Sequence, residues 1–129
     1  MRIGHDEIFL LIESEPLDGG YAAMRVEAVA SASGRKFTAS HDRLMMVTDD
    51  STVQNFSDFA SLKSGQFETT LTENGWLRFK RNSHGAITVR YRIGSWKVSA
   101  AMEGEVVVEG EFANAFCREF SILLRSQKA

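Results

Sequence analysis

Cysteine and proline are the residues that this sequence has least of, with one of each among 129 residues. A single cysteine cannot form a disulfide within the chain, and this low content favours a reducing compartment. Internal repeats, low-complexity segments and proline-rich linkers are missing as well. We therefore expect a single domain over residues 1–129, stabilised by a hydrophobic core, because a chain of this length can bury one without cross-links.

Long apolar runs and a secretion signal are also missing. The longest apolar run near the N-terminus, Ile8–Ile12, is far too short to span a bilayer. The first seven residues do not have the basic, apolar and small-residue layout of a signal peptide. We therefore expect a cytoplasmic protein that has no membrane partner.

Motifs for catalysis and for cofactors are missing too. No His/Cys spacing suits zinc, and no glycine-rich phosphate loop precedes a helix, so we expect no metal and no cofactor. His41 and Asp42 would suit acid–base chemistry, but no serine or cysteine nearby has the context of a nucleophile. The lone thiol of Cys117 is expected to be packed and inert. We predict a protein that is not an enzyme, and keep a small hydrolase centred on His41 and Asp42 as a third hypothesis.

The sequence does contain regular patterns of apolar residues. In its first part, apolar and polar residues alternate as they do in strands. Strands are predicted over residues 8–15, 21–30 and 35–40. The polar residues 41–43 that follow are predicted to be a loop, and the apolar residues 44–47 fit no single type of element. The N-terminal part is therefore expected to add strands to a sheet.

Two segments have apolar residues at helical spacing. The first begins near Asp49 and Asp50, because carboxylates suit the positive end of a helix, and ends at Ser64-Gly65. Its apolar stripe is Val53, Phe56, Phe59, Ala60 and Leu62. The second runs from about Glu111 to Ser126, and its stripe is Phe112, Phe116, Phe120, Leu123 and Leu124.

Between the helices the period changes to two, and three turns divide residues 66 to about 108 into a four-stranded antiparallel meander. The turns are assigned to Glu73-Asn74-Gly75, Ser83-His84-Gly85 and Gly94-Ser95. The apolar pairs that these turns predict are Leu71–Leu77, Phe79–Val89, Leu77–Tyr91, Ile93–Trp96, Tyr91–Val98 and Val89–Ala100, which places Trp96 in the core. The fold class is therefore α+β: a large antiparallel sheet, made of the N-terminal strands and the meander, with two helices packed on one face.

Cationic residues gather on the opposite face of the meander, although the whole chain has a net charge of -2. The predicted pairing puts Arg78 opposite Arg90, Arg92 opposite Lys97, and Trp76 where it could stack on Arg92. Like charges opposite one another are unfavourable, so a binding role for an anionic partner is one interpretation. The candidate partner-binding residues are Trp76, Arg78, Lys80, Arg90, Arg92 and Lys97.

The other interpretation is that this face is only solvated. Glu68 is predicted to lie opposite Lys80, and Glu103 and Glu105 continue the neighbouring strand, so ion pairs would neutralise much of the charge. Sequence reasoning leaves both interpretations open.

The order of the elements resembles that of the WapI-type bacterial immunity proteins and their uncharacterised relatives. The likeness covers about residues 53–124, and its matches are mainly core and turn positions. The matching pieces are Asn55-Phe56, Leu77–Phe79, Gly85–Val89, Trp96–Val98 and the helix that ends in Leu123-Leu124.

This resemblance implies an antitoxin that binds and neutralises a cognate toxin domain in the cytoplasm during bacterial competition. Against an acidic toxin surface the cationic face would serve, and it offers an aromatic anchor. Against a basic toxin, Asp49 and Asp50 would be the natural contact. The alternative function is a nucleic-acid-binding module that uses the same cationic face. A monomer and a homodimer are both compatible with the sequence.

Overall fold

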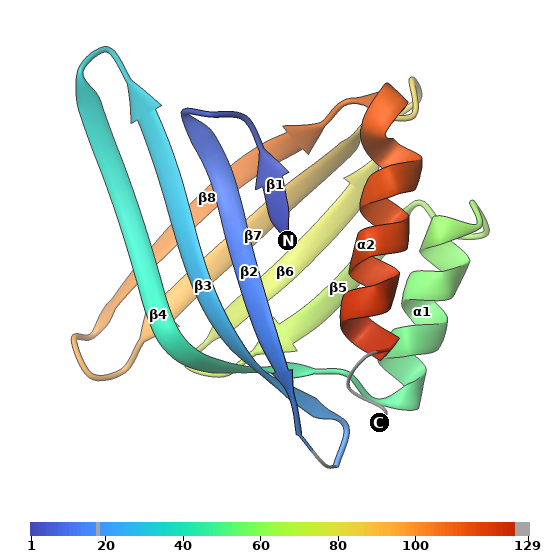
Figure 1. Cartoon of the computed structure of the whole chain (residues 1–129), viewed down its shortest axis with the longest axis horizontal. Helices are drawn as coiled ribbons and strands as arrows, with labels where there is room; N and C mark the ends of the chain where they lie inside the picture. Colours follow the sequence, from blue (N-terminus) through green and yellow to red (C-terminus); the bar gives the residue numbers. More distant parts are fainter. Residues whose placement is uncertain (18, 126–129) are drawn as a thin grey trace.

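Eight strands and two α-helices make up the computed structural model, which describes residues 1–17 and 19–125 (Figure 1). The strands are β1 (Arg2–Gly4), β2 (Ile8–Pro16), β3 (Tyr21–Ala32), β4 (Arg35–Val47), β5 (Gln66–Leu71), β6 (Gly75–Arg81), β7 (Ile87–Ser95) and β8 (Ala100–Val108). The helices are α1 (Asp50–Ala60) and α2 (Ala113–Arg125), and a short 3-10 turn, η1 (Gly110–Phe112), precedes α2. The structure confirms the predicted α+β class.

All eight strands belong to one antiparallel sheet, in which each strand pairs with the next in the sequence. The sheet curls strongly, so that β1 and β8, its first and last strands, come into contact. Figure 1 shows β1–β4 in front of β5–β8, with α1 and α2 side by side at the right-hand end. The hairpin tips of β3–β4 and β7–β8 lie on the left, away from the helices. We call the concave side of the sheet its inner face and the convex side its outer face.

A cluster of aromatic rings fills the space between the helices and the inner face of β5 and β6. Phe56 on α1 lies 5.0 Å from Phe67 and 4.9 Å from Phe120, and Phe79 lies 4.9 Å from Phe120, measured between ring centroids. The rings meet edge to face or tilted, which is the arrangement that their quadrupoles favour. The two predicted helical stripes therefore meet in one core, which continues between β2, β3 and β4.

The N-terminal strands differ from the prediction in length. β1 was not predicted, and the polar segment His41–Arg43, predicted as a loop, lies inside β4. β4 continues through it with a β-bulge, in which Asp42 and Arg43 of β4 lie opposite the single residue Arg25 of β3. Its residues are polar because this part of β4 is largely exposed, so an exposed strand was taken for a loop.

The turn between β5 and β6 lies one residue earlier than predicted, because residues 72–74 connect the two strands. Glu73 and Asn74 in this turn both have positive φ, 61° and 62°. The predicted pair Leu71–Leu77 is therefore wrong, because Leu71 lies opposite Gly75. The same shift places Glu68 opposite Arg78 rather than opposite Lys80.

The turn between β7 and β8 lies further along the chain than predicted. β7 extends to Ser95, and the pairs of Trp96, Val98 and Ala100 with β7 that were predicted are wrong. Gly94, which was taken as the start of the turn, has a different role: a Cβ there would lie 2.2 Å from the carbonyl oxygen of Glu73. The glycine is needed because the β5–β6 turn approaches the β7 backbone at this point.

The middle hairpin, β6–β7, has the predicted register, with Phe79 opposite Val89 and Leu77 opposite Tyr91. The helix ends differ. α1 ends at Ala60, so Leu62 lies beyond it and is exposed, and Phe112 lies in η1 and is exposed as well. The predicted end of the second helix, Ser126, lies outside the described residues.

Candidate functional site

Three rows of side chains cross the outer face of β5–β8, because residues directly opposite one another in a sheet share a face. The first row is Thr70, Trp76, Arg92 and Glu103. The second row is Glu68, Arg78, Arg90 and Glu105, and the third is Gln66, Lys80, Thr88 and Val107. We call these twelve residues the charged face. Five of the six predicted partner-binding residues belong to it.

The charges of this face are sorted by strand. The four cations, Arg78, Lys80, Arg90 and Arg92, lie on the central strands β6 and β7, and the three carboxylates lie on the flanking strands β5 and β8. The formal charge of the face is therefore +1, as four cations less three anions. The predicted like-charge pair of Arg78 and Arg90 is present. The predicted pair of Arg92 with Lys97 is wrong, because Glu103 lies opposite Arg92.

Two of the four cations are held by internal partners. The Arg78 Nε lies 3.0 Å from Glu68 Oε1, and the Arg92 Nη1 lies 3.0 Å from Glu103 Oε1. Arg92 also donates from Nε to the carbonyl oxygen of Asn74 at 3.0 Å. The expected stacking of Trp76 on Arg92 is wrong: the Arg78 guanidinium lies over the Trp76 ring, 3.8 Å from its centroid.

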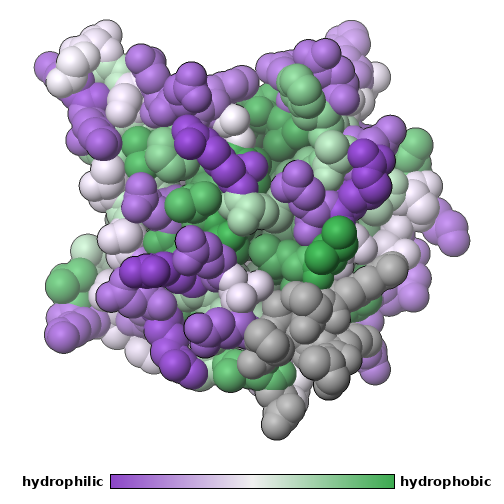
Figure 2. Space-filling view, viewed as in Figure 1, coloured by the Kyte–Doolittle hydropathy of each residue, from purple (hydrophilic) through white to green (hydrophobic). Residues whose placement is uncertain are grey.

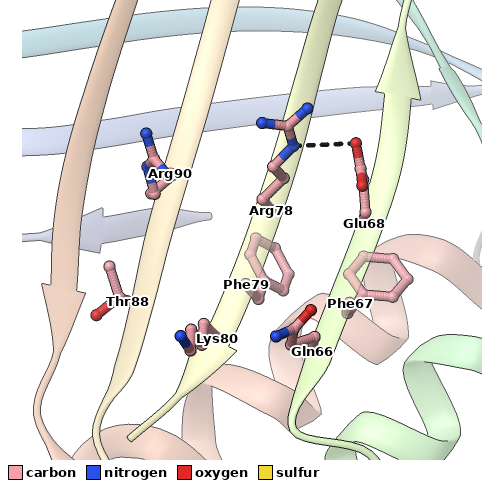
Figure 3. Close-up of a pocket in the computed structure, with 8 residues that line it drawn as sticks. All are labelled: Gln66, Phe67, Glu68, Arg78, Phe79, Lys80, Thr88 and Arg90. Carbon is pink, nitrogen blue, oxygen red and sulfur yellow. Dashed lines mark hydrogen bonds and ion pairs between the residues drawn. The ribbon is translucent and has the colours of Figure 1, made fainter.

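The other two cations, Lys80 and Arg90, border a shallow hollow of about 400 Å³ in the charged face. Figure 3 shows both side chains rising from β6 and β7 on the side opposite Phe67 and Phe79, while Arg78 turns towards Glu68. Within residues 1–17 and 19–125, neither Lys80 nor Arg90 has an ion-pair partner. The hollow is therefore bordered by two cations without an ion pair: Arg90, which lies opposite Arg78, and Lys80, which lies in the next row.

Lys97 and Trp96 lie away from these rows, in the turn between β7 and β8. Trp96 was predicted to be in the core, but 66% of its surface is exposed, as is 68% of that of Val98. The turn extends from the end of the strand that carries Arg90 and Arg92. An exposed tryptophan at the end of the charged face is the feature that sequence reasoning missed, because Trp96 and Val98 alternate like strand residues.

A polar network fixes the position of this turn. The backbone N–H of Trp96 donates to Glu73 Oε1 at 2.9 Å, and the other carboxylate oxygen of Glu73 contacts His41 Nε2. His41 Nδ1 accepts the backbone N–H of Arg43 at 3.1 Å. One carboxylate thus joins β4, the β5–β6 turn and the β7–β8 turn.

The same network bears on the hydrolase hypothesis for His41 and Asp42. Asp42 does not orient His41: its side chain is almost fully exposed, and it lies 4.0 Å from Arg25. Both ring nitrogens of His41 have internal partners, Glu73 and the Arg43 backbone, which suits a structural role. The orienting carboxylate belongs to Glu73, from a distant part of the sequence.

Asp49 and Asp50, the alternative partner-binding residues, lie at the start of α1. Asp49 is the N-cap: its Oδ1 accepts the backbone N–H and the hydroxyl of Thr52, both at 2.8 Å. These hydrogen bonds lower the pKa of Asp49 below its ordinary value of 3.8. Asp50 follows in the first turn of the helix. Capping therefore explains the presence of Asp49.

The remaining reactive groups form no site. Burial raises the pKa of the Cys117 thiol, and Arg81 NH2 lies 3.8 Å from its sulfur. In the part of the chain that the structure describes, no three His, Cys, Asp or Glu side chains gather where they could hold a metal ion. Neither helix among these residues has the length and apolar character needed to cross a membrane.

Comparisons with known proteins identify no relative of this chain. No protein-family model, no curated protein and no solved structure matches it. The resemblance to the WapI-type immunity proteins therefore depends on the core and turn residues given above.

Proposed function

We propose that this chain is a non-enzymatic binding protein, an immunity protein that neutralises a toxin domain by docking the charged face of β5–β8 on it. The observation that carries the proposal is the arrangement of this face, in which Lys80 and Arg90, two cations without an ion pair, lie beside Arg78 and Arg92, which have one. The resemblance to immunity proteins supplies the biological setting, and the geometry supplies the contact surface.

A rigid support favours recognition by this face. The strands that carry it are backed by the Phe67–Phe79 side of the aromatic core. Arg78 and Arg92 are held by carboxylates before any partner arrives, so they lose little conformational freedom on binding. Preorganisation of this kind favours affinity by lowering the entropic cost of binding, and the fixed pattern of charges favours specificity.

The layout also suggests the chemistry of the partner. Lys80 and Arg90 would pair with carboxylates of the partner. The carboxylates of β5 and β8 would face cations of the partner that lie on either side of those carboxylates. Trp76 and Trp96 provide aromatic contacts within and beside the face. The complementary surface is therefore an acidic patch flanked by basic residues on a folded protein.

Nucleic acid is the alternative partner, and the charge layout disfavours it. A phosphate backbone crossing β6 and β7 would also meet Glu68, Glu103 and Glu105, which repel it. A face of charge +1 neutralises few phosphates. If the chain binds a single-stranded oligonucleotide with an affinity that falls steeply with salt, and Arg78→Glu/Arg90→Glu abolishes this binding, the alternative replaces our proposal.

The direct test uses the protein domain encoded beside this gene, which the immunity hypothesis predicts to be a toxin. Calorimetric titration should show a stable complex, and Lys80→Glu/Arg90→Glu should weaken it by at least tenfold, because attraction becomes repulsion. The matched control is Lys63→Glu/Arg118→Glu, which reverses two exposed cations near the helices. Equal loss in both variants, or no complex at all, would contradict the proposal.

A further inference from the structure

One edge of β4 has no neighbouring strand over its first six residues. β4 pairs with β5 only where Met46 lies opposite Leu71, and the two strands then diverge. Among the described residues, no strand pairs with the outer edge of β4 between Arg35 and Ser40. In Figure 1 this part of β4 rises to the upper left, away from β5 and from the helices. Its backbone N–H and C=O groups on that edge are open to another strand.

This edge lies beside an apolar hollow on the inner face. Ile8, Ala30 and Phe37 are opposite one another on β2, β3 and β4, and they line a hollow of about 440 Å³. The next row along the same face includes Ala28, which is fully buried. Phe37, by contrast, leaves 64% of its surface exposed although it lies on the core side of the sheet. A further strand along β4 would place a side chain directly beside Phe37 and cover it.

The charge of this edge indicates which side chains an added strand would present to it. Arg35 and Lys36 are exposed, and neither has an ion-pair partner among residues 1–17 and 19–125. Figure 2 shows hydrophilic residues at the upper left corner, where Figure 1 places this hairpin. Six strand residues span about 20 Å, enough for a short extended segment.

A second copy of this chain fits the edge poorly. Antiparallel pairing of two β4 strands about Ala39 would put Arg35 opposite Arg43 of the second copy. Pairing about Phe37 would put Lys36 opposite Thr38 of the second copy, so that the two Lys36 side chains lie diagonally across the ladder. Like charges directly opposite one another are destabilising, and diagonal neighbours are still within reach of long side chains.

We propose that the edge of β4 from Arg35 to Ser40 binds an extended acidic segment of a partner protein as an added strand. Backbone hydrogen bonds supply the affinity, an apolar side chain of the segment covers Phe37, and carboxylates face Arg35 and Lys36. This proposal is independent of the charged face, which lies on other strands.

The test uses isotope-labelled protein and a blocked octapeptide of glutamates with a single valine near its centre. Amide NMR shifts should change along residues 35–40, and hydrogen exchange of the amides on the open edge should slow, when this peptide is added. The same peptide with lysine in place of glutamate should bind at least tenfold more weakly. If Arg35 and Lys36 only prevent strand pairing, neither peptide would change the amide shifts or exchange of residues 35–40. This result would overturn the proposal.

Variants distinguish the edge of β4 from the charged face as the binding site of the peptide. Arg35→Glu/Lys36→Glu should weaken binding of the glutamate peptide by at least tenfold, and Phe37→Ser should weaken it further without loss of the folded spectrum. The matched control Lys80→Glu/Arg90→Glu should leave it unchanged. Loss of binding in this control would place the peptide on the charged face and overturn the inference. Slowed exchange of residues 35–40 with rising protein concentration alone would show self-pairing and overturn it as well.

Discussion

The charged face of β5–β8 and the open edge of β4 are both cationic, but they differ in which groups remain unsatisfied. On the charged face the strands that carry the cations, β6 and β7, are paired on both edges, and Arg78 and Arg92 are bound by neighbouring carboxylates. On β4 the backbone edge from Arg35 to Ser40 is open, and Arg35 and Lys36 have no ion-pair partner among the described residues. The first region is suited to recognition through side chains, and the second to recognition through the main chain.

The largest expected effect is on stability, and it distinguishes Phe79 on β6 from Phe37 on β4. Phe79→Ala should destabilise the protein by about 3–5 kcal/mol, because it empties the centre of the aromatic cluster. Phe37→Ala should change stability by less than about 0.5 kcal/mol, since most of that ring is already in water. Urea unfolding followed by circular dichroism measures both. Similar losses in the two variants would mean that Phe37, near the tip of the β3–β4 hairpin, contributes to the core as Phe79 does.

A second contrast concerns the close approach of the β5–β6 turn to β7, which supports one end of the charged face. Gly94→Ala should destabilise the protein by about 1–3 kcal/mol, because the new methyl group would collide with the Glu73 carbonyl. Gly65→Ala, where a Cβ meets nothing within 4 Å, is the matched control and should leave stability nearly unchanged. Thermal unfolding of the two variants distinguishes them, and equal melting temperatures would argue against the described approach.

The ion pair between Glu68 and Arg78 should contribute little to stability, because both side chains are about half exposed. Glu68→Gln should cost less than about 1 kcal/mol in denaturant unfolding. The same change frees Arg78, so it should alter affinity for the partner of the charged face more than it alters folding. A double-mutant cycle with Arg78→Gln measures the coupling, and a coupling well above 1 kcal/mol would show that the face is built for stability.

The smallest effect is a dependence on pH at Asp49, which lies outside both regions. Its pKa is lowered in the folded protein, so its charge contributes stability that is present above pH 3.8 and is lost as the pH falls through the folded value. Asp49→Asn keeps a capping side chain but removes the charge. The difference in stability between this variant and the parent should therefore shrink towards zero in acid. A difference that persists unchanged at pH 2 would contradict the cause assigned here.

The sequence predicted the fold class and the β6–β7 hairpin, because local turn residues and alternation agree there. It failed where glycine serves a distant contact: Gly94 resembled a turn residue, but the approach of Glu73 requires it. That error shifted β8, hid the pairing of Arg92 with Glu103, and assigned the exposed Trp96 to the core. The alternating pattern also could not show that β4 extends past the core, since exposure depends on where the neighbouring strands end.

The Glu73 carboxylate has a consequence for the order in which the molecule assembles. It joins His41 and the backbone of Trp96, so its contacts exist only after three separate hairpins have formed and met. Each contact requires loop closure between separate hairpins, so we expect these contacts to form later than the hairpins themselves. These contacts of Glu73 should therefore slow unfolding of the native protein while leaving the rate of folding almost unaffected.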